Sequence, residues 1–133
     1  MPARIRVVDE CEDFGIIGNN PKLRQVRTII RTAAPSDASV LIEGESGTGK
    51  ELIATALHVC SERAALPFIR INCAAIPSTL IESELFGYRK VAFTGAHNDR
   101  RGLIEATAGG TLLLDEIAEM PVYLQTKLLR VLQ

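Results

Sequence analysis

The sequence lacks several features that mark membrane, metal-binding or nucleic-acid-binding proteins. No apolar run approaches the ~18 residues that span a bilayer, and residues 1–4 lead into no signal-peptide core. The three cysteines, Cys11, Cys60 and Cys73, lack the C-x-x-C spacing of zinc and redox motifs. The 15 Lys and Arg against 16 Asp and Glu leave a formal net charge of -1, which gives no indication of direct DNA binding. We therefore expect a cytoplasmic segment that contacts neither membrane nor DNA directly.

What the sequence contains is the pattern of a globular α/β protein. Of its 133 residues, 47% are hydrophobic and 23% are charged, which is typical of one globular domain. Apolar or β-branched runs predict strands, and apolar residues at helical spacing predict helices between them. The expected strands are 39–43, 68–72 and 111–115, and the expected helices are 20–35, 50–63, 79–86, 103–106 and 122–133. Because strands alternate with helices, we expect a parallel sheet flanked by helices.

The start and end of the helix over 79–86 are predicted by particular residues. Thr79 is followed three residues later by Glu82, the spacing of a capping box in which two side chains bond to the first backbone N–H groups. Gly87 follows the last helical residue, where glycine commonly ends a helix.

A glycine-rich loop lies between the first expected strand and the next helix. Gly44-Glu45-Ser46-Gly47-Thr48-Gly49-Lys50 matches the first seven positions of the phosphate-loop pattern G-x-x-x-x-G-K-[ST]. Backbone N–H groups at a helix N-terminus can surround phosphates, and Lys50 would neutralise charge between the β- and γ-phosphates. This loop predicts ATP binding; a glycine-rich turn with an exposed lysine is the alternative.

Glu51 stands where the general pattern has a hydroxyl ligand for Mg²⁺. Its carboxylate could approach the metal directly, approach it through water, or turn away, and the pattern does not decide between these.

An acidic pair follows the apolar strand 111–115. In P-loop ATPases such a strand end supplies the other half of the metal site, and Asp115 would hold Mg²⁺, usually through its water shell. Glu116 would orient and deprotonate the water that attacks the γ-phosphate. Taken alone, the pair could also be a solvated strand end.

Together these motifs resemble one particular family. Beside the loop and the acidic pair, the chain has Glu84-Leu85-Phe86-Gly87, Ala92-Phe93-Thr94-Gly95-Ala96 and Gly109-Gly110-Thr111. From about residue 16 to 133 it resembles the N-terminal portion of the sigma-54 interaction domain of bacterial transcription activators, which are AAA+ ATPases. The resemblance implies an α/β P-loop NTPase fold, truncated before the sensor strand and lid. Residues 1–15 would be a lead-in or linker, and residues 16–133 a partial domain. In this family glutamate commonly follows the loop lysine, as Glu51 does here.

The resemblance also implies roles that spacing leaves open. Phe93, Thr94 and Gly95 fall in the family's GAFTGA loop, which contacts sigma-54, although Val91 replaces its first glycine. Asn72 matches the asparagine that restrains the catalytic glutamate. Ile17 and Gly18 lie where the family brings apolar residues to the adenine. The alternatives are a loop aromatic folded on the core, a strand-end amide making local hydrogen bonds, and a staple for the first helix.

The implied function is an ATP- and Mg²⁺-dependent ATPase that assembles into a ring and remodels RNA polymerase held closed by sigma-54. The isolated 133-residue chain should hydrolyse ATP poorly or not at all, because the sequence ends before the sensor strand, the arginine fingers and the lid. In the family's sheet, a later strand separates the strand of the phosphate loop from the strand of the acids. We therefore expect that slot to be vacant and the chain to be a piece of a longer protein. The competing hypothesis is a non-catalytic module that binds nucleotide or a partner.

Overall fold

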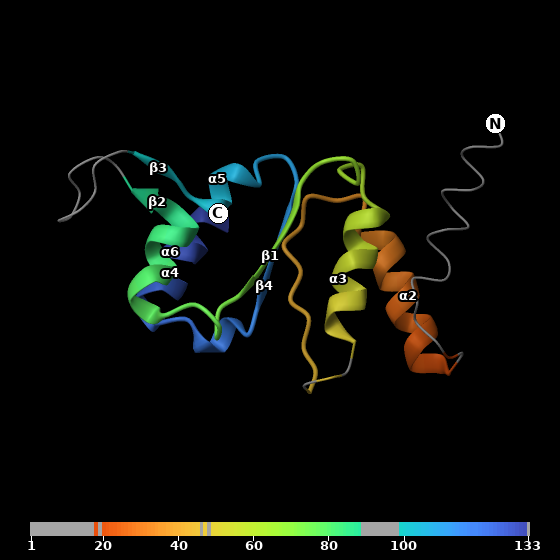
Figure 1. Cartoon of the computed structure of the whole chain (residues 1–133). Helices are drawn as coiled ribbons and strands as arrows, with labels where there is room; N and C mark the ends of the chain where they lie inside the picture. The colour runs from red at the N-terminus through yellow and green to blue at the C-terminus, as the bar shows by residue number, and fades with distance from the viewer. Residues whose placement is uncertain (1–17, 19, 46, 48, 89–98, 133) are drawn as a thin grey trace. The chain divides into compact units, whose positions relative to one another are not determined.

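The computed structural model describes residues 18, 20–45, 47, 49–88 and 99–132, which fall into two compact units divided after residue 65 (Figure 1). The first unit contains the helices α2 (Pro21–Ala33) and α3 (Lys50–Val59). The second contains the sheet strands β1 (Phe68–Asn72) and β4 (Thr111–Asp115), the short strands β2 (Gly87–Tyr88) and β3 (Arg100–Arg101), and the helices α4 (Ser78–Phe86), α5 (Leu103–Ala106), η1 (Ile117–Glu119) and α6 (Val122–Leu132). None of the described helices is long and apolar enough to cross a membrane.

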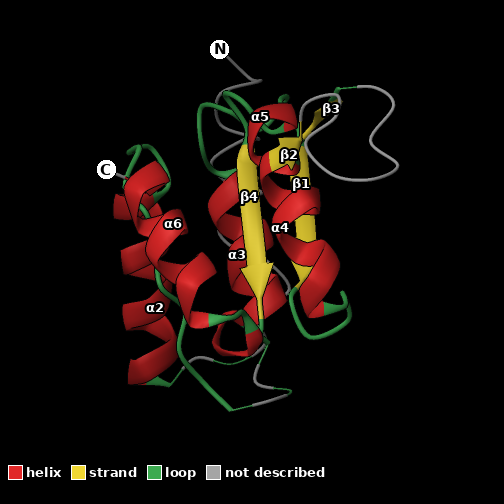
Figure 2. Ribbon diagram, turned by 90° about the vertical axis from the view of Figure 1, so that its left-hand side faces the viewer, coloured by secondary structure: helices red, strands yellow, loops and turns green. Residues whose placement is uncertain are grey.

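The two helices of the first unit pack against each other. The Asn20 side chain accepts a hydrogen bond from the N–H of Leu23 at 2.9 Å and so caps α2, and Pro21 occupies its first turn. The shared core consists of buried Ile30 and Ala56, with Leu23, Val26, Ile53, Leu57 and Cys60 partly buried around them. Both helices begin at the same end of the pair (Figures 1 and 2).

The expected strand over 39–43 is not present. Residues 37–45 form neither helix nor strand, and 46% of Val40 and 72% of Leu41 are exposed. A β-branched run favours extended backbone, but a strand also needs a neighbour for its N–H and C=O groups. The parallel sheet of the described residues consists of β1 and β4 alone. The segment before the phosphate loop therefore lies outside any sheet.

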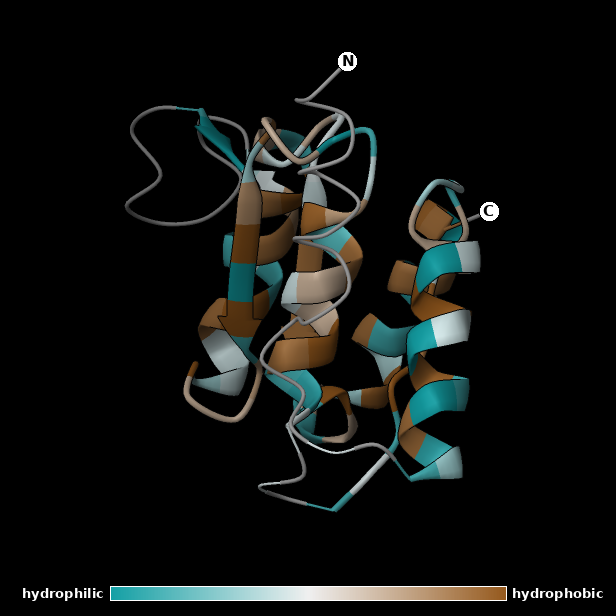
Figure 3. Ribbon diagram, turned by 90° about the vertical axis from the view of Figure 1, so that its right-hand side faces the viewer, coloured by the Kyte–Doolittle hydropathy of each residue, from teal (hydrophilic) through white to brown (hydrophobic). Residues whose placement is uncertain are grey.

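The second unit is built on this two-stranded parallel sheet. β1 and β4 pair in register from Phe68 with Thr111 to Asn72 with Asp115. Both strands are mostly hydrophobic (Figure 3), and the buried core joins them to α4 and α6 (Figure 2). The core residues are Ile71, Cys73, Ile81, Leu85, Met120, Leu124 and Leu128. The expected α/β class with a parallel sheet and flanking helices is confirmed.

Helix α4 begins differently from the prediction. It starts at Ser78 with Pro77 in the cap position and without a side-chain cap, so the capping box of Thr79 and Glu82 is wrong. The carboxylate of Glu82 instead pairs with Lys127 of α6 at 3.1 Å. The helix ends before Gly87 as predicted, and the φ of 71° at this glycine is in the region that disfavours other residues.

The strands β2 and β3 form an antiparallel pair against the end of α4. A Cβ atom at Gly87 would lie 2.2 Å from the carbonyl oxygen of Arg100, and one at Gly102 would lie 2.3 Å from that of Leu85. An ion pair of 3.1 Å between Arg100 and Glu84 joins β3 to α4. Backbone contact and charge thus fix β2 and β3 to the end of α4.

Candidate functional site

The phosphate loop bends through glycines in the left-handed region. Gly47 has φ 80°, and Gly49 has φ 86° and ψ 23°. A Cβ at Gly47 would meet nothing within 4 Å, so the backbone angle and not space requires glycine there. Gly49 is also the cap residue of α3, and it has no side chain that could satisfy the first N–H groups of the helix. These exposed donors at a helix N-terminus suit a phosphate group.

Lys50, the first residue of α3, directs its ammonium across the loop. Its Nζ donates a hydrogen bond of 2.9 Å to the carbonyl oxygen of Gly44, so the positive charge lies over the loop's first residue. Glu51 is exposed in the first turn of α3, where a negative charge interacts favourably with the helix dipole. The loop residues therefore combine backbone donors with one cation, as a phosphate site needs.

A turn at Gly18 is attached to the first turns of α2. The Arg27 guanidinium donates a hydrogen bond of 2.7 Å to the carbonyl oxygen of Gly18. Gly18 has φ 127°, a conformation that side chains rarely adopt, and a Cβ there would lie 2.6 Å from Leu23 Cδ1. Asn20 completes the turn through its cap to Leu23 and its carbonyl bond to the N–H of Arg24 at 3.1 Å.

The acidic pair lies at the carboxyl end of β4. One Asp115 carboxylate oxygen accepts a hydrogen bond from the N–H of Glu116 at 2.9 Å, which orients the carboxylate at the strand end. Asn72 ends the neighbouring strand in register with Asp115. Its side-chain oxygen accepts from the N–H of Ala74 at 2.9 Å, the local hydrogen bond that the sequence left open as an alternative. The sheet thus places the amide next to the acids.

Glu116 has a strained backbone. Its φ of 52° and ψ of 47° make it the one non-glycine residue with positive φ among those described. A left-handed conformation costs a non-glycine residue about 1–3 kcal/mol and is often found at functional sites. The chain therefore turns at Glu116, an exposed residue directly after β4, in a conformation that the sequence pattern did not predict.

The residues at this strand end fit Mg²⁺ only if other ligands help to hold it. No group of three or more His, Cys, Asp or Glu side chains that could hold a metal exists in the described part of the chain. Mg²⁺ is commonly held by one or two carboxylates together with substrate phosphates and water. Asp115 fits that type of site, in which the nucleotide supplies the remaining ligands.

Cys73, directly after β1, is a free buried thiol close to the acids. Its N–H donates to the carbonyl oxygen of Asp115 at 3.0 Å. Burial raises the pKa of the Cys73 thiol, and the charge of Asp115 raises it further. The thiol is therefore kept protonated rather than activated as a nucleophile.

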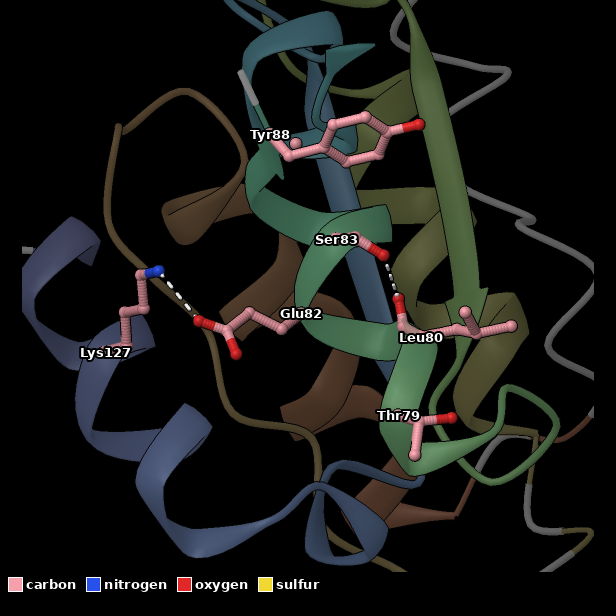
Figure 4. Close-up of a pocket in the computed structure, with 7 residues that line it drawn as sticks. Thr79, Leu80, Glu82, Ser83, Tyr88 and Lys127 are labelled. Carbon is pink, nitrogen blue, oxygen red and sulfur yellow. Dashed lines mark hydrogen bonds and ion pairs between the residues drawn. The ribbon is translucent and has the colours of Figure 1, made fainter. Parts of the chain in front are cut away.

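A second feature of this unit is a pocket of about 570 Å³ beside α4 (Figure 4). Lys127 points from α6 toward Glu82, and its Nζ also lies 4.4 Å from the centre of the Phe86 ring. The pocket is lined by Thr79, Leu80, Glu82, Ser83, Gly87, Tyr88 and Lys127. Lys127 therefore joins α6, which follows the acids, to α4, which leads to β2.

Some predicted site residues lie outside the described residues. These are Ile17 in the expected adenine segment, Ser46 and Thr48 in the phosphate loop, and Phe93, Thr94 and Gly95 in the expected contact loop, as well as Val91. Their roles stay predictions.

Two further residues were missed by the sequence analysis. Arg27 and Lys127 belong to no motif of the sequence. Their partners, Gly18 and Glu82, are 9 and 45 residues away. No local pattern signals either contact.

Known proteins are similar in sequence to this chain. The family described as "Sigma-54 interaction domain" matches residues 16–133. The luminescence regulatory protein LuxO of Vibrio campbellii is 60% identical over 119 residues, which are 90% of this chain and 26% of LuxO. The regulatory protein AtoC of Escherichia coli K12 is 59% identical over 118 residues, which are 89% of this chain and 26% of AtoC. The chain thus spans about a quarter of the length of these relatives.

A solved structure shares its fold as well. The crystal structure of NtrX from Brucella abortus in complex with ATP matches with a TM-score of 0.76 and 35% identity. The match covers 98% of this chain and 27% of the NtrX chain. The predicted fold, the α/β P-loop NTPase fold of the AAA+ class, is confirmed by this likeness and by the family match.

Proposed function

The chain belongs to the sigma-54 interaction domain family, and we propose from this that it is the nucleotide-binding part of an ATP-hydrolysing transcription activator. The complete protein would use hydrolysis to remodel the sigma-54 RNA polymerase holoenzyme and would assemble into a homo-oligomeric ring. Residues 1–15 would be a lead-in, and residues 16–133 part of the interaction domain. The cytoplasm is its expected location, and we expect no direct DNA contact from this segment.

The phosphate loop is the observation that carries this proposal. Left-handed Gly47 and Gly49 turn the chain into α3, and the ammonium of Lys50 reaches back across the loop. Such a loop can hold a triphosphate by its N–H groups and neutralise charge that develops on the departing γ-phosphate. The proposed nucleotide contacts are Gly44, Glu45, Ser46, Gly47, Thr48, Gly49, Lys50 and Glu51, with Ile17 and Gly18 at the adenine.

The acids at the end of β4 would carry the chemistry. Asp115 would help to hold Mg²⁺, which supplies positive charge to the phosphate oxygens when bound. Glu116 would orient the attacking water and accept its proton, and it directly follows the strand end in a left-handed turn. Asn72, in register with Asp115, would restrain Glu116 through its amide nitrogen, while its side-chain oxygen keeps the local bond to the N–H of Ala74.

The contact with sigma-54 is proposed for Phe93, Thr94 and Gly95. Their segment starts and ends at β2 and β3, which are fixed to α4 by close backbone packing and by the Arg100–Glu84 ion pair. A fixed base suits a segment that must transmit force to a partner.

The test of nucleotide binding is titration of the purified chain with ATP and Mg²⁺ by calorimetry. Lys50→Ala should weaken binding by at least about tenfold, because an ammonium contact to phosphate is a charge-assisted bond worth roughly 1.5–3 kcal/mol. Lys22→Ala, which removes an exposed lysine of α2, is the matched control and should bind as the wild type does. Equal binding by the wild type and Lys50→Ala would contradict the proposal.

A non-catalytic module that binds nucleotide or a partner is the second candidate. One observation favours it: residues 37–45, which lead into the phosphate loop, lie outside any sheet. Phosphate release by the purified chain, with and without a full-length homologue, separates the two candidates. Sustained turnover by the chain alone would exclude the binding module.

A further inference from the structure

The turn at Gly18 is held more firmly than a linker before a helix needs to be. Its carbonyl oxygen accepts from Arg27, which lies nine residues further on, at 2.7 Å. The φ of 127° at Gly18 and the 2.6 Å approach of its Cβ position to Leu23 leave room only for glycine without rearrangement. Gly18 is thus bonded to α2 through Arg27, and Asn20, the cap residue of the helix, is bonded to Leu23 and Arg24.

The helix that holds this turn is also packed on the helix that starts at the phosphate loop. Leu23 and Val26 of α2 lie in the same cluster as Ile53 and Ala56 of α3. Because both helices begin at the same end of the pair (Figure 1), Gly18, which precedes α2, and Gly49, which precedes α3, lie at that same end. The packed helix pair therefore fixes the separation between the turn and the loop.

This arrangement suits a ligand that has an anionic end and an uncharged end. The phosphates would bind at the loop, where N–H groups and Lys50 provide positive charge. The other end of an extended nucleotide would reach the turn at Gly18. Because the guanidinium of Arg27 donates to a backbone carbonyl there, Arg27 shapes the turn by way of Gly18.

We propose that Arg27 is a positioning residue that fixes the turn at Gly18 as the contact for the nucleoside part of the bound nucleotide. The inference rests on the proposed nucleotide-binding function and adds a residue to it. Arg27 contributes to recognition of the base and ribose through the shape of the turn and makes no contribution to the phosphates.

The experiment compares ATP with inorganic tripolyphosphate, which has the phosphates but no nucleoside. Dissociation constants of both ligands are measured by calorimetry at one Mg²⁺ concentration, for the wild-type chain and for Arg27→Met, Arg27→Lys and Arg31→Met. Arg27→Met keeps the aliphatic bulk and removes the donors. Arg31→Met removes the same charge from the last turn of the same helix and is the matched control.

We expect Arg27→Met to weaken ATP binding by about tenfold, the effect of one lost charge-assisted hydrogen bond, and tripolyphosphate binding by less than about twofold. Arg27→Lys, which retains a donor and the charge, should restore part of the ATP affinity. Arg31→Met should change neither constant. Circular dichroism of each variant verifies that α2 and α3 remain folded. If Arg27→Met does not fold, the test is the affinity of Arg27→Lys for ATP divided by its affinity for tripolyphosphate. A ratio lower than that of the wild type supports the inference, and an unchanged ratio refutes it.

Other outcomes overturn the inference in distinguishable ways. If Arg27→Met lost the same affinity for ATP and for tripolyphosphate, Arg27 would only stabilise the unit as a whole. If its affinity for ATP were unchanged, Arg27 would have no role in recognition of the nucleoside. If the wild type bound neither ligand, or if Lys50→Ala left both constants unchanged, the proposed function itself would fail and this inference with it.

Discussion

Replacing Gly102 by alanine should destabilise the second unit, because backbone atoms already occupy the place of the new methyl group. A Cβ at Gly102 would lie 2.3 Å from the carbonyl oxygen of Leu85, 2.4 Å from the carbonyl carbon of Phe86 and 2.5 Å from the nitrogen of Gly87. None of these atoms can move by a change of rotamer. Either β3 or the end of α4 must shift, and overpacking of this kind costs about 1–3 kcal/mol or more.

Alanine variants of two other glycines distinguish the effect of this collision from the effect of backbone strain. Gly102 has an ordinary φ of -77°, so its alanine variant suffers only the collision. Gly109 has φ 80° but only an ordinary 3.6 Å contact with Leu66 Cδ1, so its alanine variant suffers only strain, about 1–2 kcal/mol. Gly87 combines φ 71° with a 2.2 Å approach to the oxygen of Arg100, and its variant should lose about 2–5 kcal/mol.

The free energies of unfolding are measured by urea denaturation, followed by circular dichroism because the chain has no tryptophan. The expected order of destabilisation is Gly87→Ala, then Gly102→Ala, then Gly109→Ala, with melting temperatures falling by about 3–5 °C per kcal/mol. All three glycines lie in the same unit, so the three variants are compared with the same wild-type free energy of unfolding. A cost at Gly102 no larger than that at Gly109 would refute the close packing of β3 on α4.

Four further changes test the site and its supports. In the full-length protein, Lys50→Ala should abolish ATP turnover, measured as phosphate release; unchanged turnover would remove Lys50 from the mechanism. Glu116→Gly should relieve the left-handed strain and stabilise the chain by up to about 1 kcal/mol in urea denaturation, while abolishing the proposed hydrolysis. Lys127→Met should cost about 0.5–1.5 kcal/mol, because its ion pair and ring contact are half exposed, and high salt should reduce this cost. Because the pKa of the Cys73 thiol is raised in the folded chain, the free energy of unfolding should fall as the pH rises above the ordinary thiol pKa, where only the unfolded chain ionises. Asp115→Asn should weaken this fall and speed alkylation of the thiol at pH 8–9. A free energy of unfolding that does not change with pH in this range would contradict the prediction.

The sequence predicted those elements whose signals are local or repeated. The apolar runs of 68–72 and 111–115 are the strands of the structure with the same bounds, and Gly87 ends α4 as expected. The run 39–43 has an equally good strand composition, yet it forms no strand. Composition describes what a segment tolerates, whereas a strand requires a partner for its backbone groups.

The capping box failed for a related reason. Thr79 and Glu82 have the right spacing, but the carboxylate of Glu82 is engaged by Lys127 of a distant helix. The helix begins at Ser78 with Pro77 as its cap residue, so Thr79 already lies inside the first turn, and the sequence does not show where the helix starts. The glycines of the phosphate loop were predictable because their backbone angles depend on residue type. The hydrogen bond from Arg27 to Gly18 was not predictable, because it joins residues nine positions apart and no local pattern signals it.

The backbone of Glu116 shows what the motif alone could not give. The pattern of an acidic pair after an apolar strand assigns Glu116 its chemistry, but it does not say that the residue has φ 52°. Glycine or asparagine would adopt this conformation at lower cost, so a glutamate here sacrifices stability. The loss of stability is explained if the chain must turn directly after β4 while the Asp115 carboxylate, bonded to the N–H of Glu116, stays at the strand end. The backbone thus leaves Asp115 on the strand and Glu116 in the turn after it, an arrangement compatible with separate roles at the metal and at the water.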